Sequence, residues 1–225
     1  ARALQAGDPL RALGLVGRLE NAEGLLIRGI AYAQVGDYEL AETSLDRAIA
    51  ITSSPRAKDK DARTITARAR AALVEILLNR GDAGPAARAA RESVLELERL
   101  GDQHNANMQR LVLARAEVLL GRIEEARTVV AEMLGGKVVL GADITAIALL
   151  ADAEIAIRTM RASAARESLR RARRVLEEAP NPILARALVL LEQELSHPIA
   201  RLVREKIARD ADLYVDRLFG DAPAL

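Results

Sequence analysis

The sequence predicts an all-α protein, and three observations support that fold class. Alanine, leucine, arginine and glutamate, which are strong helix formers, dominate the composition. Aromatic residues make up only 2% of the chain, whereas β-sandwiches and barrels favour aromatic and β-branched residues. A short turn followed by an amphipathic segment also recurs along the chain, as expected for stacked helix pairs.

The recurring unit is clearest in GIAYAQVGDYELAETSLDRAIA, residues 29–50. Related segments are AGDPLRALGLVGRL, RGDAGPAARAARESV, LGRIEEARTVVAEM and TMRASAARESLRRA, of which the last lacks the turn glycine. An alanine follows each turn position by five residues: Ala12, Ala41, Ala86, Ala126 and Ala165. Glycine ends a helix because it reaches positive φ at low cost, and the small alanine lets a neighbouring helix approach closely. Turns spaced by roughly 30 to 45 residues are typical of helical repeats.

Apolar residues at i, i+3, i+4 and i+7, together with the breaks between them, place the individual helices. An aspartate beside the turn glycine can cap the helix that follows. Pro55 ends a helix before the polar loop Thr52–Lys60, Gly135–Lys137 form a second break, and the prolines of APNP (179–182) form a third. The expected helices span residues 9–20, 22–35, 38–51, 60–80, 84–100, 103–120, 123–134, 143–159, 162–178, 182–195 and 198–218.

The pattern changes at Pro198, where HPIARLVREKIARDADLYVDRLFG predicts a final amphipathic helix. This helix either caps the last repeat, as solenoids require, or links to a further C-terminal domain, and we favour the cap. The predicted organisation is therefore one solenoid, with helical repeats over residues 1–180 and capping or linker helices over residues 181–225.

These features resemble the tetratricopeptide repeat. The best copy runs from about Ala22 to Pro55 and matches the signature spacing at Leu25, Gly29, Tyr32, Gly36, Tyr38, Ala41, Leu45 and Ala48. Arg28 departs from the signature, since the family usually has an apolar residue there. Later copies are degenerate: Ala114 and Ala153 replace the first-helix glycine, while Leu77 and Glu117 replace the aromatic residue of Tyr32. The resemblance covers about residues 1–180 and implies a right-handed α-α superhelix of antiparallel helix pairs.

Charge and composition exclude several classes of function. A net charge of +1 gives no global attraction for nucleic acid, so we do not expect direct nucleic-acid binding. No apolar run reaches the roughly 18 residues needed to span a membrane, and we expect no membrane partner. The lack of cysteine fits a reducing compartment, which with the lack of a signal peptide predicts a cytoplasmic protein. The start ARALQAGDPL, without Met, suggests a piece of a larger protein, and the excess of arginine over lysine suggests a bacterial source.

No constellation of residues points to catalysis or to a cofactor. His104 and His197 are the only histidines, and neither has partners at metal-ligand spacing. The GGK segment at Gly135–Lys137 lacks the preceding glycine and the following Ser or Thr of a phosphate-binding loop. We therefore expect no enzyme activity, no metal and no cofactor.

The resemblance implies that the first helix of each pair lines a concave groove. By matching the copies, the groove would carry Leu26, Ile27, Ile30, Gln34, Ala72, Glu75, Leu78, Asn79, Met108, Val112, Arg115, Leu119, Ile147, Leu150, Glu154 and Arg158. Glu75, Arg115 and Glu154 fall at equivalent places and could form an alternating charge ladder. Such a ladder would serve either a bound helix or extended peptide, or an internal ion-pair chain that ties neighbouring helices together.

A run of arginines provides a second candidate surface. Its members are Arg158, Arg161, Arg166, Arg170, Arg171, Arg173 and Arg174, interrupted only by the acid Glu167. The run either binds an anionic partner or is a solvated helix face whose arginines are partly paired with acids of neighbouring repeats. No aromatic residue interleaves it, which argues against base stacking.

The predicted function is a non-catalytic interaction module that binds a protein or peptide in the concave groove. The alternative is a sensory or oligomerisation domain of a larger bacterial transcription regulator, because similar repeats accompany DNA-binding domains there. A helix-turn-helix segment in the parent gene would favour this alternative. Self-association through exposed apolar helix faces is a further expectation.

Overall fold

The computed structural model describes residues 2–5, 7–53, 59–136 and 140–196, and every regular element in these ranges is a helix. The all-α prediction is therefore confirmed for the described residues. The chain divides into two compact units, Ala1–Met133 and Leu134–Leu225. The predicted helix over residues 198–218 and His197, for which no ligand role was predicted, lie outside the described residues.

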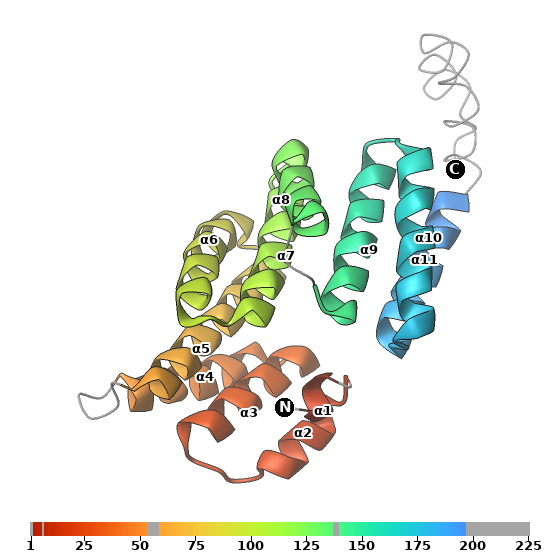
Figure 1. Ribbon diagram of the computed structural model, residues 1–225. Coiled ribbons are helices and arrows are strands. Elements are labelled where there is room, and N and C mark those ends of the chain that lie inside the picture. The colour runs from red at the N-terminus through yellow and green to blue at the C-terminus, as the bar shows by residue number, and fades with distance from the viewer. Residues whose placement is uncertain (1, 6, 54–58, 137–139, 197–225) are drawn as a thin grey trace, which may run out of the picture. The chain divides into compact units, whose positions relative to one another are not determined.

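The first unit contains α1 (Arg2–Gln5), α2 (Pro9–Val16), α3 (Ala22–Val35), α4 (Tyr38–Thr52), α5 (Lys60–Asn79), α6 (Ala83–Leu100), α7 (Gln103–Leu119) and most of α8 (Ile123–Gly135). Consecutive helices from α1 to α7 pack against one another (Figure 1). Helix α5 also contacts both α3 and α7, so these three odd-numbered helices form one layer.

The second unit contains α9 (Ala142–Arg158), α10 (Ala162–Glu178) and α11 (Pro182–Ser196), and each of these helices contacts the other two. Its core includes Leu149 from α9, Leu169 from α10 and Leu188 from α11. In the first unit, one cluster joins α3, α4 and α5 around Leu26, Leu45 and Ile76, and another joins α5, α6 and α7.

The turns between paired helices share one hydrogen-bond pattern. Gly36, Gly81, Gly101 and Gly121 adopt φ values between +75° and +96°, and Met160 takes the same position with φ +58°. After each of them, the next backbone N–H donates to a carbonyl five residues earlier, as in Asp37 N to Tyr32 O at 3.0 Å and Arg161 N to Ala156 O at 2.8 Å. This is the Schellman ending of an α-helix, and it persists where Met160 replaces glycine.

The five alanines that follow the turns lie in the core. Ala12 is 2% exposed, and Ala41, Ala86, Ala126 and Ala165 are completely buried. Because a larger side chain would separate the helices at these points, the predicted packing role of this position is confirmed.

Nine of the ten predicted helices that fall on described residues agree with the structure to within one residue at both ends, whereas the first is four residues shorter than expected. Helix α2 ends at Val16, and Gly17 follows with φ +48°. Arg28 holds the connection to α3, because its Nη2 donates to the carbonyl oxygens of Gly17 (3.1 Å) and Leu19 (2.8 Å) and its Nη1 donates to Glu20 (3.2 Å). The departure of Arg28 from the repeat signature thus has a structural role.

Candidate functional site

Helices α3, α5 and α7, which form the odd-numbered layer of the first unit, carry most of the predicted groove. Each begins with a polar residue whose side chain accepts a hydrogen bond from the first turn. Asn21 accepts from Gly24 N at 2.8 Å, Asp59 from Ala62 N at 2.7 Å, and Asp102 from Asn105 N at 3.4 Å. These caps fix where the helices start and hence the register of the side chains that they present.

Most of the predicted groove residues on these helices reach solvent. Gln34, Glu75, Asn79, Arg115 and Leu119 are exposed, and Ile30 and Met108 are half-buried. Leu119 stands out because it is a large apolar residue with 56% of its surface exposed. The surface formed by these seven residues is called the odd-helix face below.

Leu26 does not belong to this face. It is only 5% exposed and packs in the cluster that contains Leu45 and Ile76. The implied groove positions Ala72 and Leu78 are also buried in core clusters. Because their side chains fill the space between helices, these three residues are unavailable to a partner.

The polar centre of the odd-helix face lies between α5 and α7. Arg115 on α7 donates from Nη1 to Asn79 Oδ1 on α5, at a long distance of 3.4 Å. Among the described residues Arg115 has no ion-pair partner, so its guanidinium keeps most of its donor capacity. The packing of two helices thus unites three of the residues predicted from the sequence, Glu75, Asn79 and Arg115.

Glu75 has an unusual electrostatic setting. Burial among the surrounding helices raises the pKa of its carboxyl to about 7, while the positive charge of Arg115 acts in the opposite direction. The side chain still reaches water on its exposed side, but protein replaces the water around the rest of the carboxyl. Near neutral pH this group can therefore exist both as a hydrogen-bond donor and as a carboxylate.

Leu150, a groove position implied on α9 in the second unit, is buried in the core of that unit. The charged groove residues of α9 are Glu154 and Arg158. Both side chains are about half exposed, and Arg158 Nη2 donates to Glu154 Oε1 at 2.9 Å within the helix. Within the second unit these two residues therefore satisfy each other. Exposed i,i+4 pairs of this kind contribute only a few tenths of a kcal/mol.

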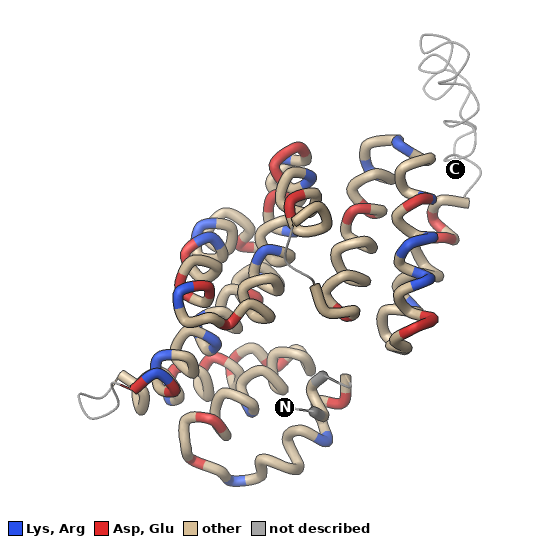
Figure 2. Tube along the Cα trace, in the orientation of Figure 1, with Lys and Arg blue, Asp and Glu red and all other residues tan. Residues whose placement is uncertain are grey.

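Helix α10, whose arginines are blue in Figure 2, carries five members of the run, and all five are exposed: Arg166, Arg170, Arg171, Arg173 and Arg174. Arg173 Nη2 donates to both oxygens of Glu192 on α11, at 2.7 and 2.6 Å, and this carboxylate raises the pKa of the Arg173 guanidinium. Arg170 pairs with Glu167. Arg166, Arg171 and Arg174 are exposed and have no ion pair within the described ranges. The surface is thus partly neutralised, as one of the two interpretations of the sequence expected.

A buried ion-pair network was missed in the sequence. Glu117 is completely buried and accepts hydrogen bonds from Arg91 on α6 and from Arg122 in the turn before α8. The only signal in the sequence was that Glu117 occupies the position of Tyr32 in the best repeat. The network joins α6, α7 and the turn before α8, and both arginines are about half exposed.

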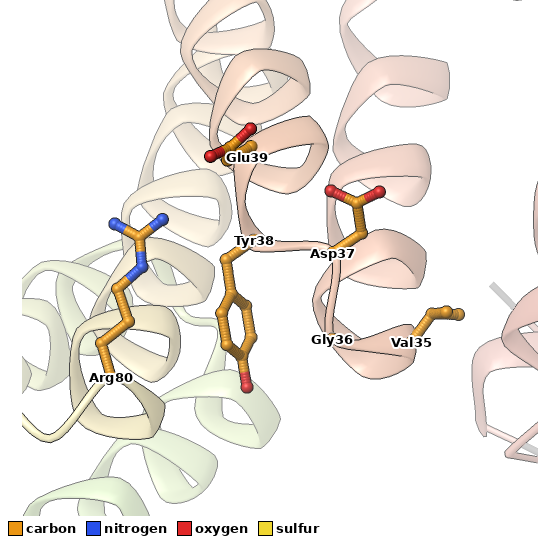
Figure 3. Close-up of a pocket in the computed structure, with 6 residues that line it drawn as sticks. All are labelled: Val35, Gly36, Asp37, Tyr38, Glu39 and Arg80. Carbon is orange, nitrogen blue, oxygen red and sulfur yellow. The ribbon is translucent and has the colours of Figure 1, made fainter.

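A surface hollow was also missed. It has a volume of about 580 Å3 and is lined by Val35, Gly36, Asp37, Tyr38, Glu39 and Arg80 (Figure 3). The Arg80 guanidinium carbon lies 5.8 Å from the centre of the Tyr38 ring, and Arg80 also pairs with Glu42. Tyr38 and Gly36 were assigned to helix packing, because the repeat signature explained them without a site.

Comparison with known protein families, curated proteins and solved structures finds no match to this chain. Among the described residues, no three histidine, aspartate or glutamate side chains gather closely enough to hold a metal ion. None of the described helices has the length and apolar character required to cross a lipid bilayer.

Proposed function

We propose that this protein is a non-catalytic interaction module that binds a protein or peptide on the odd-helix face. The observation that carries the proposal is the side-by-side packing of α3, α5 and α7, which brings Glu75, Asn79 and Arg115 to one exposed surface. Convergent polar groups among apolar neighbours are typical of surfaces that recognise a helix or an extended peptide.

The apolar part of the face supplies the area that such binding needs. Ile30 and Met108 are half-buried and Leu119 is exposed, so a partner could remove apolar surface from water around the polar centre. Met108 can adapt its shape to different partners because its side chain is unbranched. A preformed helical layer also lowers the cost of ordering on binding.

The proposal includes a right-handed, tetratricopeptide-like superhelix in which this layer is the concave side. Support comes from the alternation of helix pairs, the five buried alanines and the repeated Schellman turns. The right-handed sense of the superhelix is inferred from the resemblance stated for residues 1–180.

The test is an affinity capture from a lysate of the source organism, with bound proteins identified by mass spectrometry. Wild type is compared with Arg115→Glu, which reverses the unpaired charge at the polar centre. Arg88→Glu is the matched control, because Arg88 is exposed on α6 outside the odd-numbered layer. All three proteins must first show equal helicity and equal thermal midpoints.

A specific partner should be captured by wild type and Arg88→Glu and reduced about tenfold or more by Arg115→Glu, because like charges in an interface cost several kcal/mol. Equal capture by all three proteins would move the binding surface off the odd-helix face, with the α10 arginines next to be tested. Absence of any partner would favour the alternative of a sensory or oligomerisation domain.

A further inference from the structure

We propose that the hollow at the α3–α4 turn binds the guanidinium group of an arginine in a basic protein segment. This inference goes beyond the proposed function, because it concerns a different set of residues from the odd-helix face. It rests on the shape of the hollow, on its charge and on the arginine that the protein itself places there.

The hollow is open where a ligand has to enter. Gly36 adopts φ +92°, and a Cβ added there would meet no atom within 4 Å. Beside it Val35 is 49% exposed, which gives the methylene groups of a long side chain an apolar surface to pack on. The hollow opens widely to solvent, and its volume of about 580 Å3 has room for an arginine side chain.

The charges at the hollow favour a cation. Arg80 is the only basic residue in the lining, and it already pairs with Glu42 through contacts of 2.7 and 2.9 Å. Asp37 uses Oδ1 to accept from Leu40 N at 3.1 Å, which leaves Oδ2 to a ligand. Within the described ranges neither Asp37 nor Glu39 has an ion-pair partner for its carboxylate.

The helix ends add to this field. The C-termini of α3 and α5 meet at the hollow, and their carbonyl groups carry partial negative charge. The N-terminus of α4 has the opposite sign, but Asp37 caps it. Because Arg80 is paired with Glu42 and the α4 N-terminus is capped by Asp37, the two negative helix ends and the Glu39 carboxylate make the hollow attractive for a cation.

Arg80 shows which cation fits. Its guanidinium lies over the Tyr38 ring and pairs with the carboxylate of Glu42, which is on α4 like Tyr38. An incoming guanidinium would meet the carboxylates of Asp37 and Glu39, which point to the same side in Figure 3, whereas the Tyr38 ring of the same lining extends to the other side, beside Arg80. Arginine suits it better than lysine, because a planar guanidinium both stacks on aromatic rings and bonds carboxylates through two N–H groups.

The proposal is tested by nuclear magnetic resonance with acetyl-arginine-amide as the probe and 15N-labelled protein. The neutral isostere acetyl-citrulline-amide controls for shape, and acetyl-lysine-amide controls for charge. We expect the arginine probe to bind weakly and to shift the amide signals of Gly36, Asp37, Glu39 and Arg80, with smaller shifts from lysine and none from citrulline.

Variants then assign the interaction to the hollow. Glu39→Gln should weaken arginine binding about three- to fivefold, in line with the modest energy of an exposed cation site. Glu125→Gln is the matched control, because Glu125 is also an exposed acid in the first turn of a helix, α8, that is the second of its pair as α4 is. This substitution should leave arginine binding unchanged. Asp37→Asn should also weaken binding while keeping the α4 cap, since asparagine caps as well as aspartate.

Three results would overturn the proposal: no shift at the hollow, equal shifts from citrulline, or equal weakening by Glu125→Gln. None of them would bear on the odd-helix face, because Arg115 and its neighbours take no part in the experiment. Conversely, failure of the lysate capture would leave the arginine titration unaffected.

Discussion

Glu75 is the residue whose chemistry depends most on its surroundings. A solvated glutamate is ionised at neutral pH, but burial raises the pKa of Glu75 to about 7 against the influence of Arg115. Among the described residues of the odd-helix face, these two are the only charged ones on α3, α5 and α7. Protonation of Glu75 therefore changes this polar centre from near neutral to net positive.

This pKa predicts how stability depends on pH. Because the folded-state pKa is raised, the folded protein binds the Glu75 proton more tightly than the unfolded chain does. The resulting stability is fully present below the unfolded pKa of about 4.5 and is lost as the pH rises through about 7. Thermal midpoints of wild type and Glu75→Gln should be measured across that window. As the pH rises, the midpoint of the variant should become higher than that of wild type. Parallel curves would show that Glu75 titrates as a solvated carboxyl.

Single residues also show where sequence reasoning stopped. Glu75 and Arg115 were placed at equivalent positions of successive repeats, with Asn79 on the same groove surface, and the structure brings Asn79 and Arg115 into contact. The partnership of Glu117 with Arg91 and Arg122 was not found, because a buried carboxylate is recognised only from its three-dimensional neighbours. Leu26 was misplaced for a related reason: helical periodicity alone does not separate a core position from its neighbour on the groove side.

Among the elements, the α3–α4 pair shows how a small residue sets helix separation. Gly29 lies where α3 crosses α4, and a Cβ added there would be 2.5 Å from Leu45 Cγ and 3.1 Å from the carbonyl oxygen of Ala41. Leu45 is completely buried in the core and the Ala41 oxygen is backbone, so neither can move aside at low cost.

Gly29→Ala should therefore destabilise the protein by about 1–3 kcal/mol, although alanine is the better helix former. Gly14 on α2 is the matched control, because an added Cβ there meets nothing within 4 Å. Gly14→Ala should stabilise by up to about 1 kcal/mol. Chemical denaturation of both variants measures the difference, and equal stabilisation by both substitutions would refute the close helix crossing.

Helix positions were predictable because turns and apolar spacing are local signals. The end of α2 was the exception, since nothing near Gly17 in the sequence reveals that Arg28 binds the carbonyls of Gly17 and Leu19. The left-handed turn at Met160 was likewise hidden, because its residue type does not indicate positive φ. In both cases contacts or backbone geometry outside the local pattern decided the result.

For the whole molecule, the sequence predicted a single stack with a charge ladder from Glu75 through Arg115 to Glu154. The structure assigns Glu75 and Arg115 to one compact unit and Glu154 to the other, so the ladder stays a prediction. Repeat spacing does not reveal such units, because each copy reflects only the packing of its own helix pair. The candidate site is accordingly defined on the first unit alone.

The two units should respond separately to damage in their cores. Every buried cluster in the described part of the chain lies wholly within one unit, and helical repeats are stabilised mainly by their nearest neighbours. Leu149, which is 1% exposed, lies in the core of the second unit, and the completely buried Leu97 lies in the core of the first.

Leu149→Ala should cost the second unit about 2–5 kcal/mol and thus reduce amide protection in α9 and α10 by about tenfold or more. Protection in α5 and α6 should stay at its wild-type level, and Leu97→Ala should give the reverse pattern. Hydrogen exchange followed by mass spectrometry measures both at peptide resolution. If either substitution reduced amide protection equally throughout the chain, the two units would unfold together. A substitution in the core of one unit lowers protection in the other unit only when the two unfold in a single step.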